Sequence, residues 1–284
     1  MTLPNFVIAG AQKAGTSTLA ATLRTHPHVF MARPKELHFF DRGWKRGVDW
    51  YREQFPAKKR HLAVGEATPS YLFEATVRER MHEVLPEARI IVSLREPVSR
   101  AYSHYWHQRR KGNERTGSFE EALELESDRI NEEDIQLRVR HAYAARGLYL
   151  EQLEALAELY GREQIHVLLF EDLLGDRVPT LRRVLAFLGV DEDLAETMPE
   201  RWNNRNSFQP GAAGEDADED SDGDPDGSDD TGADTSGAPA RRNATGSAYP
   251  PIDPETAARL HDFYREPNRR LGEWLSRDLS HWDR

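Results

Sequence analysis

The chain has 284 residues, which is long enough for one α/β domain with a sizeable buried core and slightly longer than such a domain needs. It contains no cysteine, which excludes disulfides, thiolate metal sites and thiol nucleophiles and removes any need for an oxidising compartment. The formal net charge of -11 argues against a nucleic-acid partner.

One segment carries that negative charge. Residues 211–240 contain 11 Asp and Glu and no Lys or Arg, which leaves 38 acidic and 38 basic side chains in the rest of the chain. The segment holds almost no large apolar side chains, so it buries too little surface to offset the entropy of ordering. We therefore expect a disordered acidic insertion over 211–240, within a single domain formed by residues 1–210 and 241–284.

The sequence predicts neither a secretory leader nor a membrane span. Residues 1–10 lack a basic region and a long apolar stretch, and no run of about 18 apolar residues follows them. We expect a cytoplasmic protein with no integral membrane segment.

Apolar runs that alternate with helical patterns predict a parallel sheet covered by helices on both faces. In chain order, strands are expected at 6–9, 62–64, 90–94 and 165–170, each followed by a helix, at 16–25, 71–84, 97–110 and 180–188. Residues 118–160 are expected to form further helices, with Leu150, Leu153, Leu156 and Leu159 on one packed face. A last amphipathic helix should begin at Pro254, with Leu260, Phe263, Tyr264 and Leu271 at its apolar positions.

A loop typical of phosphate binding runs from Gly10 to Thr18, between the first strand and the first helix. Backbone N–H groups and the helix dipole favour an anion there. A nucleoside triphosphatase loop places lysine directly after its second glycine. Here Thr16 follows Gly15 and Lys13 lies inside the loop, which argues against an ordinary ATPase or kinase. The alternative is a glycine turn with a solvated lysine.

A second anion site is indicated where the third strand ends. Arg95 is expected at the carboxyl end of that strand, the usual ligand-binding edge of a parallel sheet, and Ser103 in the early turns of the next helix. An arginine together with a hydroxyl can hold a terminal phosphate through charge-assisted hydrogen bonds. The alternative is a surface pair between Arg95 and Glu96.

Five segments together resemble the sulfotransferase family, in particular its heparan sulfate N- and 3-O-sulfotransferase branch. They are Lys13–Thr18, Lys35–Asp41, Gly65–Tyr71, Arg95 with Ser103, and Pro250–Asn268, and they span almost the whole chain outside 211–240. The resemblance implies an α/β fold with a central parallel sheet and a P-loop-like site. It also implies transfer of the sulfuryl group of 3′-phosphoadenosine 5′-phosphosulfate (PAPS) to a hydroxyl or amine of an acceptor, with no metal required.

The resemblance also implies roles for individual residues. Lys13 would stabilise charge on the leaving phosphate oxygen, Glu36 would take the proton of the acceptor, and His38 would orient the base or the acceptor. The implied donor-binding residues are Lys13, Ala14, Gly15, Thr16, Ser17, Thr18, Arg95, Ser103, Thr245, Gly246, Ser247, Ala248 and Tyr249, of which Arg95 and Ser103 hold the 3′-phosphate. The implied acceptor-binding residues are Lys35, Glu36, Thr68, Pro69, Ser70 and Tyr71.

The chain departs from the family pattern at two places. Ala67 stands where heparan-type enzymes often carry lysine, which weakens the case for a polyanionic acceptor. The loop from Thr245 to Tyr249 lacks both basic residues of a Lys-Gly-Arg type loop, for which Arg241 and Arg242 are candidate substitutes. We expect the partner to be a glycan or another small hydroxylated acceptor.

Several of these residues also have structural interpretations. The alternative for Glu36 is a surface carboxylate paired with Lys35, and the alternative for His38 is a core histidine. Trp44, Trp50 and Trp106 can stack on sugar faces, although aromatic residues more often pack in the core or at its rim. Two other functions stay open, a small-molecule kinase with an altered phosphate loop and a noncatalytic module whose acidic insertion recruits basic partners.

Overall fold

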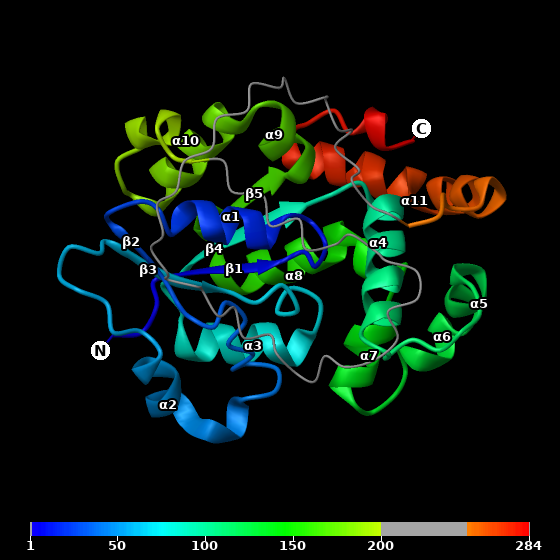
Figure 1. The fold of residues 1–284 in the computed structure, drawn as a ribbon, viewed down its shortest axis with the longest axis horizontal. Coiled ribbons are helices and arrows are strands. Elements are labelled where there is room, and N and C mark those ends of the chain that lie inside the picture. The colour runs from blue at the N-terminus through cyan, green and yellow to red at the C-terminus, as the bar shows by residue number, and fades with distance from the viewer. Residues whose placement is uncertain (1, 200–248, 284) are drawn as a thin grey trace, which may run out of the picture.

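The computed structural model describes residues 2–199 and 249–283 (Figure 1). The expected insertion at 211–240, both candidate arginines at 241 and 242, and the donor-loop positions Thr245, Gly246, Ser247 and Ala248 lie outside the described residues. Tyr249 is the one member of that loop that is described.

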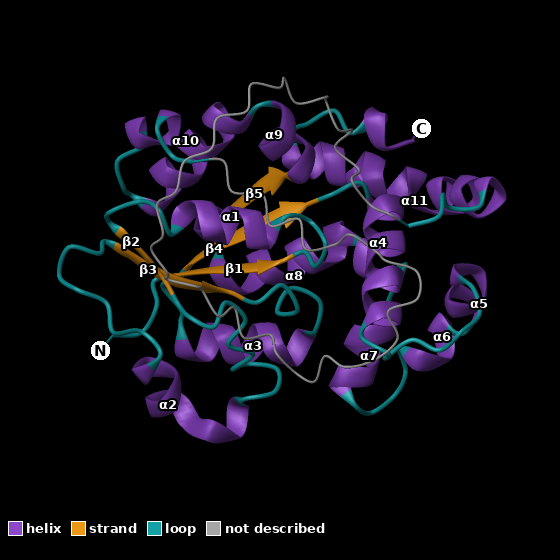
Figure 2. Cartoon of the chain, viewed as in Figure 1, coloured by secondary structure: helices purple, strands orange, loops and turns teal. Residues whose placement is uncertain are grey.

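A five-stranded parallel sheet forms the centre of the structure (Figure 2). Its strands are β1 (Phe6–Gly10), β2 (Val29–Met31), β3 (Ala63–Ala67), β4 (Arg89–Leu94) and β5 (Ile165–Leu169), in the order β2-β3-β1-β4-β5. Every residue of β1 is buried, as expected of a strand with neighbours on both sides and helices above and below. The predicted α/β class with a central parallel sheet is confirmed.

Helices cover both faces of the sheet. They are α1 (Thr16–Leu23), α2 (Gly47–Glu53), α3 (Ala75–Val84), α4 (Pro97–Arg110), α5 (Phe119–Glu124), α6 (Glu126–Arg129), α7 (Ile135–His141), α8 (Tyr149–Tyr160), α9 (Phe170–Gly175), α10 (Arg177–Leu188) and α11 (Pro254–Leu275). Val7 and Ala9 belong to one apolar cluster with α3 and α8, and Phe6 and Ile8 to another with α1 and α10. The alternation along β1 thus directs its side chains to two opposite layers.

Helix α4 lies across the end toward which the strands point (Figure 1). Glu96 caps its first turn, because its two carboxylate oxygens accept hydrogen bonds from the amides of Val98 and Ser99, each at 2.7 Å. Pro97 at the first helical position needs no amide partner. Of the helices described here, none is long and apolar enough to cross a membrane.

The sequence misplaced several boundaries. The short edge strand β2 and helix α2 were not expected. Strand β3 extends to Ala67, because Glu66 and Ala67 pair with β1 where a loop was expected. Leu62, expected to begin that strand, is 55% exposed. Helix α3 begins at Ala75 rather than at Tyr71. Phe263 is 49% exposed, so the apolar face of α11 is narrower than its sequence pattern predicted.

Candidate active site

The candidate site lies at the carboxyl edge of the sheet, where loops leave β1, β2, β3 and β4. The phosphate loop follows β1, and two hydrogen bonds fasten it to β4. Ser93 Oγ donates to the carbonyl of Ala14 at 2.6 Å, and the amide of Ala11 donates to the carbonyl of Ser93 at 2.7 Å. Both sides of this loop are therefore fixed by the central strands.

Gly15 lets the loop turn into α1. Its φ of 80° lies in the left-handed region, and a β-carbon there would collide with the ring of Phe170. Since α1 begins at Thr16, the amides of Thr16, Ser17 and Thr18 are the first of the helix and have no carbonyl partner within it. Such amides together with the helix dipole suit an anionic group.

Lys13 projects from this loop into a cationic environment. Burial, together with the positive charges of Arg110, Arg95 and Lys35, lowers the pKa of its ammonium to about 7, while Glu36 opposes the shift. An anion bound beside this ammonium would stabilise its charged form and raise its pKa. Lys13 is therefore placed to bind a negatively charged group rather than to rest in solvent.

Arg95 occupies the predicted position just past β4. Its Nη1 donates to the carbonyl of Lys13 at 3.2 Å, and its guanidinium lies 5.4 Å from the ring centre of Phe170. Glu96 is occupied as the cap of α4, so the arrangement favours a ligand-facing arginine over the surface pair. Ser103 lies in the second turn of α4 and is mostly buried, with 8% of its surface exposed.

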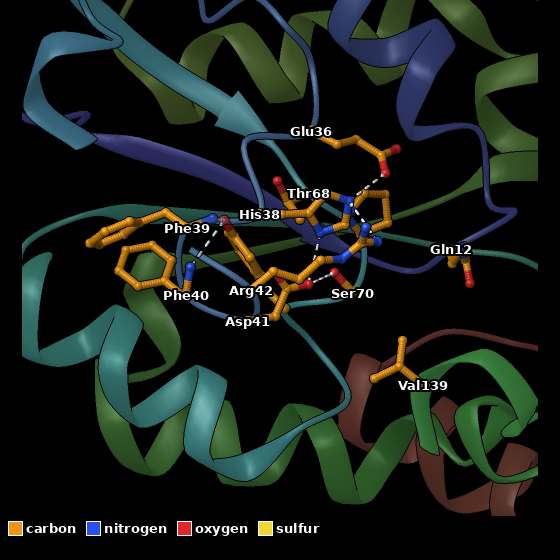
Figure 3. Close-up of polar contacts among 12 residues, drawn as sticks. Gln12, Glu36, His38, Phe39, Phe40, Asp41, Arg42, Thr68, Ser70 and Val139 are labelled. Atoms are coloured by element: carbon orange, nitrogen blue, oxygen red, sulfur yellow. Dashed lines mark hydrogen bonds and ion pairs between the residues drawn. The ribbon is translucent and has the colours of Figure 1, made fainter. Parts of the chain in front are cut away.

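A row of four polar side chains joins the loop after β2 to the loop after β3 (Figure 3). Glu36 Oε2 lies 3.4 Å from His38 Nε2, and His38 Nδ1 lies 2.8 Å from Asp41 Oδ2. Ser70, from the loop after β3, donates its hydroxyl to the same Asp41 oxygen at 2.6 Å. The row links the predicted base to the predicted acceptor loop, and Asp41 is a member that the sequence assigned no role.

Opposite charges set the proton positions in this row. Burial would lower the pKa of His38, but its contacts with Asp41 and Glu36 raise that pKa to about 9, so the ring is an imidazolium near neutral pH. Burial would raise the pKa of Glu36, but Lys35 and His38 outweigh it and hold that pKa well below its usual value. Glu36 is therefore a carboxylate, whose basicity Lys35 and His38 hold down, and His38 is its ion-pair partner rather than a core histidine.

The structure separates the members of the predicted acceptor loop. Thr68 and Tyr71 are buried, and their hydroxyls donate to Glu66 at 2.5 and 3.2 Å. These two side chains therefore point into the protein interior and stabilise the loop. Tyr71 also accepts a hydrogen bond from the amide of Phe39 at 2.8 Å. Contact with an acceptor stays a prediction for Pro69 and Ser70.

Arg146 is a functional candidate that the sequence did not reveal. Its side chain is fully enclosed and donates to Gln12 Oε1 at 2.8 Å, to the carbonyl of Val139 at 3.1 Å and to the carbonyl of Pro69 at 3.2 Å. Burial lowers the pKa of this guanidinium to about 9. One buried cation thus ties the phosphate loop to the acceptor loop. Arg146 belongs to no sequence motif, so its contacts with the two loops could be found only in the folded structure.

Glu66 is the second residue that the sequence missed. It is completely buried, and the hydroxyl of Tyr51 donates to it at 2.7 Å in addition to those of Thr68 and Tyr71. Burial raises its pKa from 4.5 to about 7, although the hydroxyl hydrogen bonds oppose the shift. The folded state therefore holds its proton more tightly than the unfolded chain does.

We expect Glu66 to make the protein less stable as the pH rises. Below pH 4.5 both states carry the proton, whereas between 4.5 and 7 only the folded state keeps it. The free energy of unfolding should therefore fall across this window, by about 3 kcal/mol from this group. Urea unfolding of the wild type and of Glu66→Gln at pH 5 and pH 8 measures this decrease. The free energy of unfolding should fall more in the wild type than in the variant. Equal losses in both proteins would contradict the assignment.

The three candidate tryptophans are engaged in packing. Trp44 and Trp50 lie 5.5 and 6.1 Å from the ring of Phe39, and Trp106 is stacked on Tyr249 at 5.6 Å between ring centres. The structural interpretation fits all three, and Tyr249 is held at α4 by the same stack. Ala67, where a lysine was considered, is fully buried in the apolar cluster that includes Ile8 and Leu19. Position 67 therefore contributes no charge.

Chemically, the edge presents an anion-binding loop with a lysine, a second basic position, and a carboxylate held in its charged form. Within residues 2–199 and 249–283, no group of three His, Cys, Asp or Glu side chains is placed to hold a metal ion. The arrangement suits transfer of an anionic group between a bound donor and a nucleophile whose proton the carboxylate accepts.

Comparisons with known proteins agree with this chemistry. A family model described as "Sulfotransferase domain" matches residues 3–274. The chain is 30% identical to mouse heparan sulfate glucosamine 3-O-sulfotransferase 3B1 over 290 residues, which cover 99% of this chain and 65% of the mouse protein. It is 27% identical to human bifunctional heparan sulfate N-deacetylase/N-sulfotransferase 2 over 288 residues, 97% of this chain and 30% of that protein.

A solved structure, the crystal structure of a sulfotransferase from Alicyclobacillus acidocaldarius, superposes with a TM-score of 0.72 at 31% identity, covering all of both chains. The heparan sulfate relatives are longer. This chain spans about two thirds or less of their length.

Proposed function

Because this chain belongs to the sulfotransferase family, we propose that it transfers the sulfuryl group of PAPS to a hydroxyl or amine of a carbohydrate acceptor. The carbohydrate class is supported by the mouse and human relatives, which are named for heparan sulfate. A glycan or another small hydroxylated molecule is the proposed partner. The cytoplasmic location expected from the sequence stays a prediction.

In the proposed step, the acceptor oxygen or nitrogen attacks the sulfur of the donor and loses its proton to Glu36. A bond from the acceptor to sulfur forms, and the bond between sulfur and the 5′-phosphate oxygen breaks, leaving its electron pair on that oxygen. The ammonium of Lys13 stabilises the charge that develops there. His38, held by Asp41, keeps the carboxylate of Glu36 oriented toward the acceptor.

One observation carries this proposal. Lys13 and Glu36 come from loops after two different strands, yet the Nζ of Lys35 donates both to Glu36 Oε1 at 2.5 Å and to Ser17 Oγ at 2.7 Å, at the end of the loop that carries Lys13. A group for the leaving oxygen and a group for the incoming proton therefore share one site. A small-molecule kinase, the second candidate from the sequence, is disfavoured because Thr16 occupies the lysine position of a triphosphatase loop.

Nucleotide binding tests the donor side. We expect 3′-phosphoadenosine 5′-phosphate (PAP), the reaction product, to raise the melting temperature, whereas ADP should leave it nearly unchanged because ADP lacks the 3′-phosphate for Arg95. Loss of the charged hydrogen bonds in Arg95→Ala should weaken PAP binding roughly 10- to 100-fold. Arg60→Ala, at an exposed loop position, is the matched control. Stabilisation by ADP and magnesium but not by PAP would favour the kinase.

Transfer tests the acceptor side. Radiolabelled sulfur should move from PAPS to a glucosamine-containing heparan-type oligosaccharide, and mass spectrometry of the product identifies the hydroxyl or amine modified. If label moves only to other hydroxylated compounds, the carbohydrate class is wrong while the sulfotransferase reaction stands.

A further inference from the structure

Lys35 connects the two halves of the candidate site. Its Nζ donates to Ser17 Oγ at 2.7 Å and to Glu36 Oε1 at 2.5 Å, and only 11% of its side chain is exposed. Ser17 lies in the first turn of α1, at the end of the phosphate loop, and Glu36 is the proposed base. A single ammonium therefore touches the donor side and the acceptor side at once.

Its position follows from the chain. Lys35 and Glu36 are consecutive in the loop after β2, the edge strand, whereas Ser17 follows β1. The charge of Lys35 also lowers the pKa of Lys13. The site thus contains two lysines of different origin, one within the phosphate loop and one beside the base.

In-line transfer gives these two lysines different tasks. The sulfur must pass from an oxygen stabilised by Lys13 to an atom whose proton goes to Glu36. A group within hydrogen-bond distance of both sides therefore lies beside that path. The migrating group presents three peripheral oxygens that carry negative charge in the transition state. An ammonium has three hydrogens to donate and suits those oxygens.

We propose that Lys35 is a further catalytic residue, whose ammonium moves from the Glu36 carboxylate to the sulfuryl oxygens when the donor binds. The proposal rests on the sulfotransferase reaction above. Two effects follow from one movement, because the migrating group gains a cation while the base loses the partner that holds it in its least basic state. Lys35 thereby makes the base fully active only when a sulfuryl donor is present.

The acidic side of the pH profile reports the contact with Glu36. Activity requires Glu36 without its proton, so kcat/KM rises with pH through the pKa of this carboxyl in the free enzyme. Lys35 contributes to keeping that pKa low. Its removal should raise the pKa and move the acidic limb of the profile to higher pH, an effect that a lysine without contact with the base would not have.

The test compares Lys35→Met and Lys35→Arg with wild type, and with Lys59→Met at an exposed loop position as control. We expect kcat for sulfuryl transfer from PAPS to fall about 10²- to 10³-fold in Lys35→Met, with partial recovery in Lys35→Arg. PAP lacks the sulfuryl group, so its thermal stabilisation should stay unchanged, which also verifies folding. Lys35→Gln replaces the Met variant if the latter does not fold.

A Lys35→Met enzyme with kcat within about threefold of wild type would overturn the proposal, since the expected loss is that of a preorganised donor. So would a lower kcat with an unmoved acidic limb, because the contact with the base would then have no part in the reaction. Failure of the proposed function is distinct from both results, since wild-type protein would then transfer no label from PAPS at all.

Discussion

Replacing Lys13 with Met is expected to reduce kcat for sulfuryl transfer by about 10³-fold, the upper range for loss of one preorganised donor in a transition state. Methionine has an unbranched side chain close in length to the lysine stem but carries no charge. The substitution therefore mainly removes the electrostatic contribution of Lys13. The leaving phosphate oxygen gains charge as its bond to sulfur breaks, and Lys13 projects from the loop built to hold that group. Rates with saturating PAPS measure the effect.

The pH profile gives Lys13 a second signature. Burial and neighbouring cations lower its pKa to about 7, so in the free enzyme the cationic form predominates below that pH and is lost above it. We therefore expect kcat/KM for PAPS to fall as the pH rises through about 7, and Lys13→Arg to move this basic limb to higher pH. A Met variant as active as wild type would exclude Lys13 from the reaction.

Replacing Glu36 with Gln is expected to lower kcat by about 10²- to 10⁴-fold, the range for a lost general base. Gln keeps the size of the side chain and an oxygen for Lys35 and His38, but it cannot take a proton at the pH of the reaction. Binding of PAP should be unaffected, because the carboxylate acts on the acceptor. Single-turnover transfer to the oligosaccharide isolates the chemical step.

The matched control for Glu36 is Glu53→Gln, an exposed carboxylate near the end of α2, which should leave kcat unchanged. Since Lys35 and His38 keep the pKa of Glu36 well below its usual value, the wild-type acidic limb should lie below the range of an ordinary glutamate. A Glu36→Gln enzyme with full activity would assign proton removal to another group or to solvent.

The donor half of the site was largely predictable from the sequence. Gly15 and Lys13 stand in one continuous segment between a strand and a helix, and Arg95 directly follows an apolar run, so local pattern and strand polarity suffice. The parallel sheet was predictable for the same reason. Its edge strand β2 was not, because three residues give too short a pattern to separate from a loop.

The acceptor half depends on contacts that no local pattern encodes. Arg146 lies 134 residues from Gln12 in the chain, and Asp41 lies 29 residues from Ser70. The sequence placed Glu66 in a loop, whereas tertiary packing buries it among three hydroxyls. The inward orientation of Thr68 and Tyr71 was unpredictable for the same reason. Their hydroxyls donate to that buried carboxylate, and only the folded structure shows which side of the loop faces outward.

The strand order sets the direction of the chemistry. Taken across the carboxyl edge from β4 to β1, β3 and β2, the loops carry Arg95, then Lys13, then Ser70, then Glu36. Because each loop leaves the end of its own strand, the strand order fixes the order of these loops along the edge of the sheet. In the proposed reaction, the donor side of the row lies at the β4 and β1 end and the acceptor side at the β3 and β2 end. Fitting a larger or smaller acceptor therefore concerns the β3 and β2 end of this row, while the nucleotide end stays as it is.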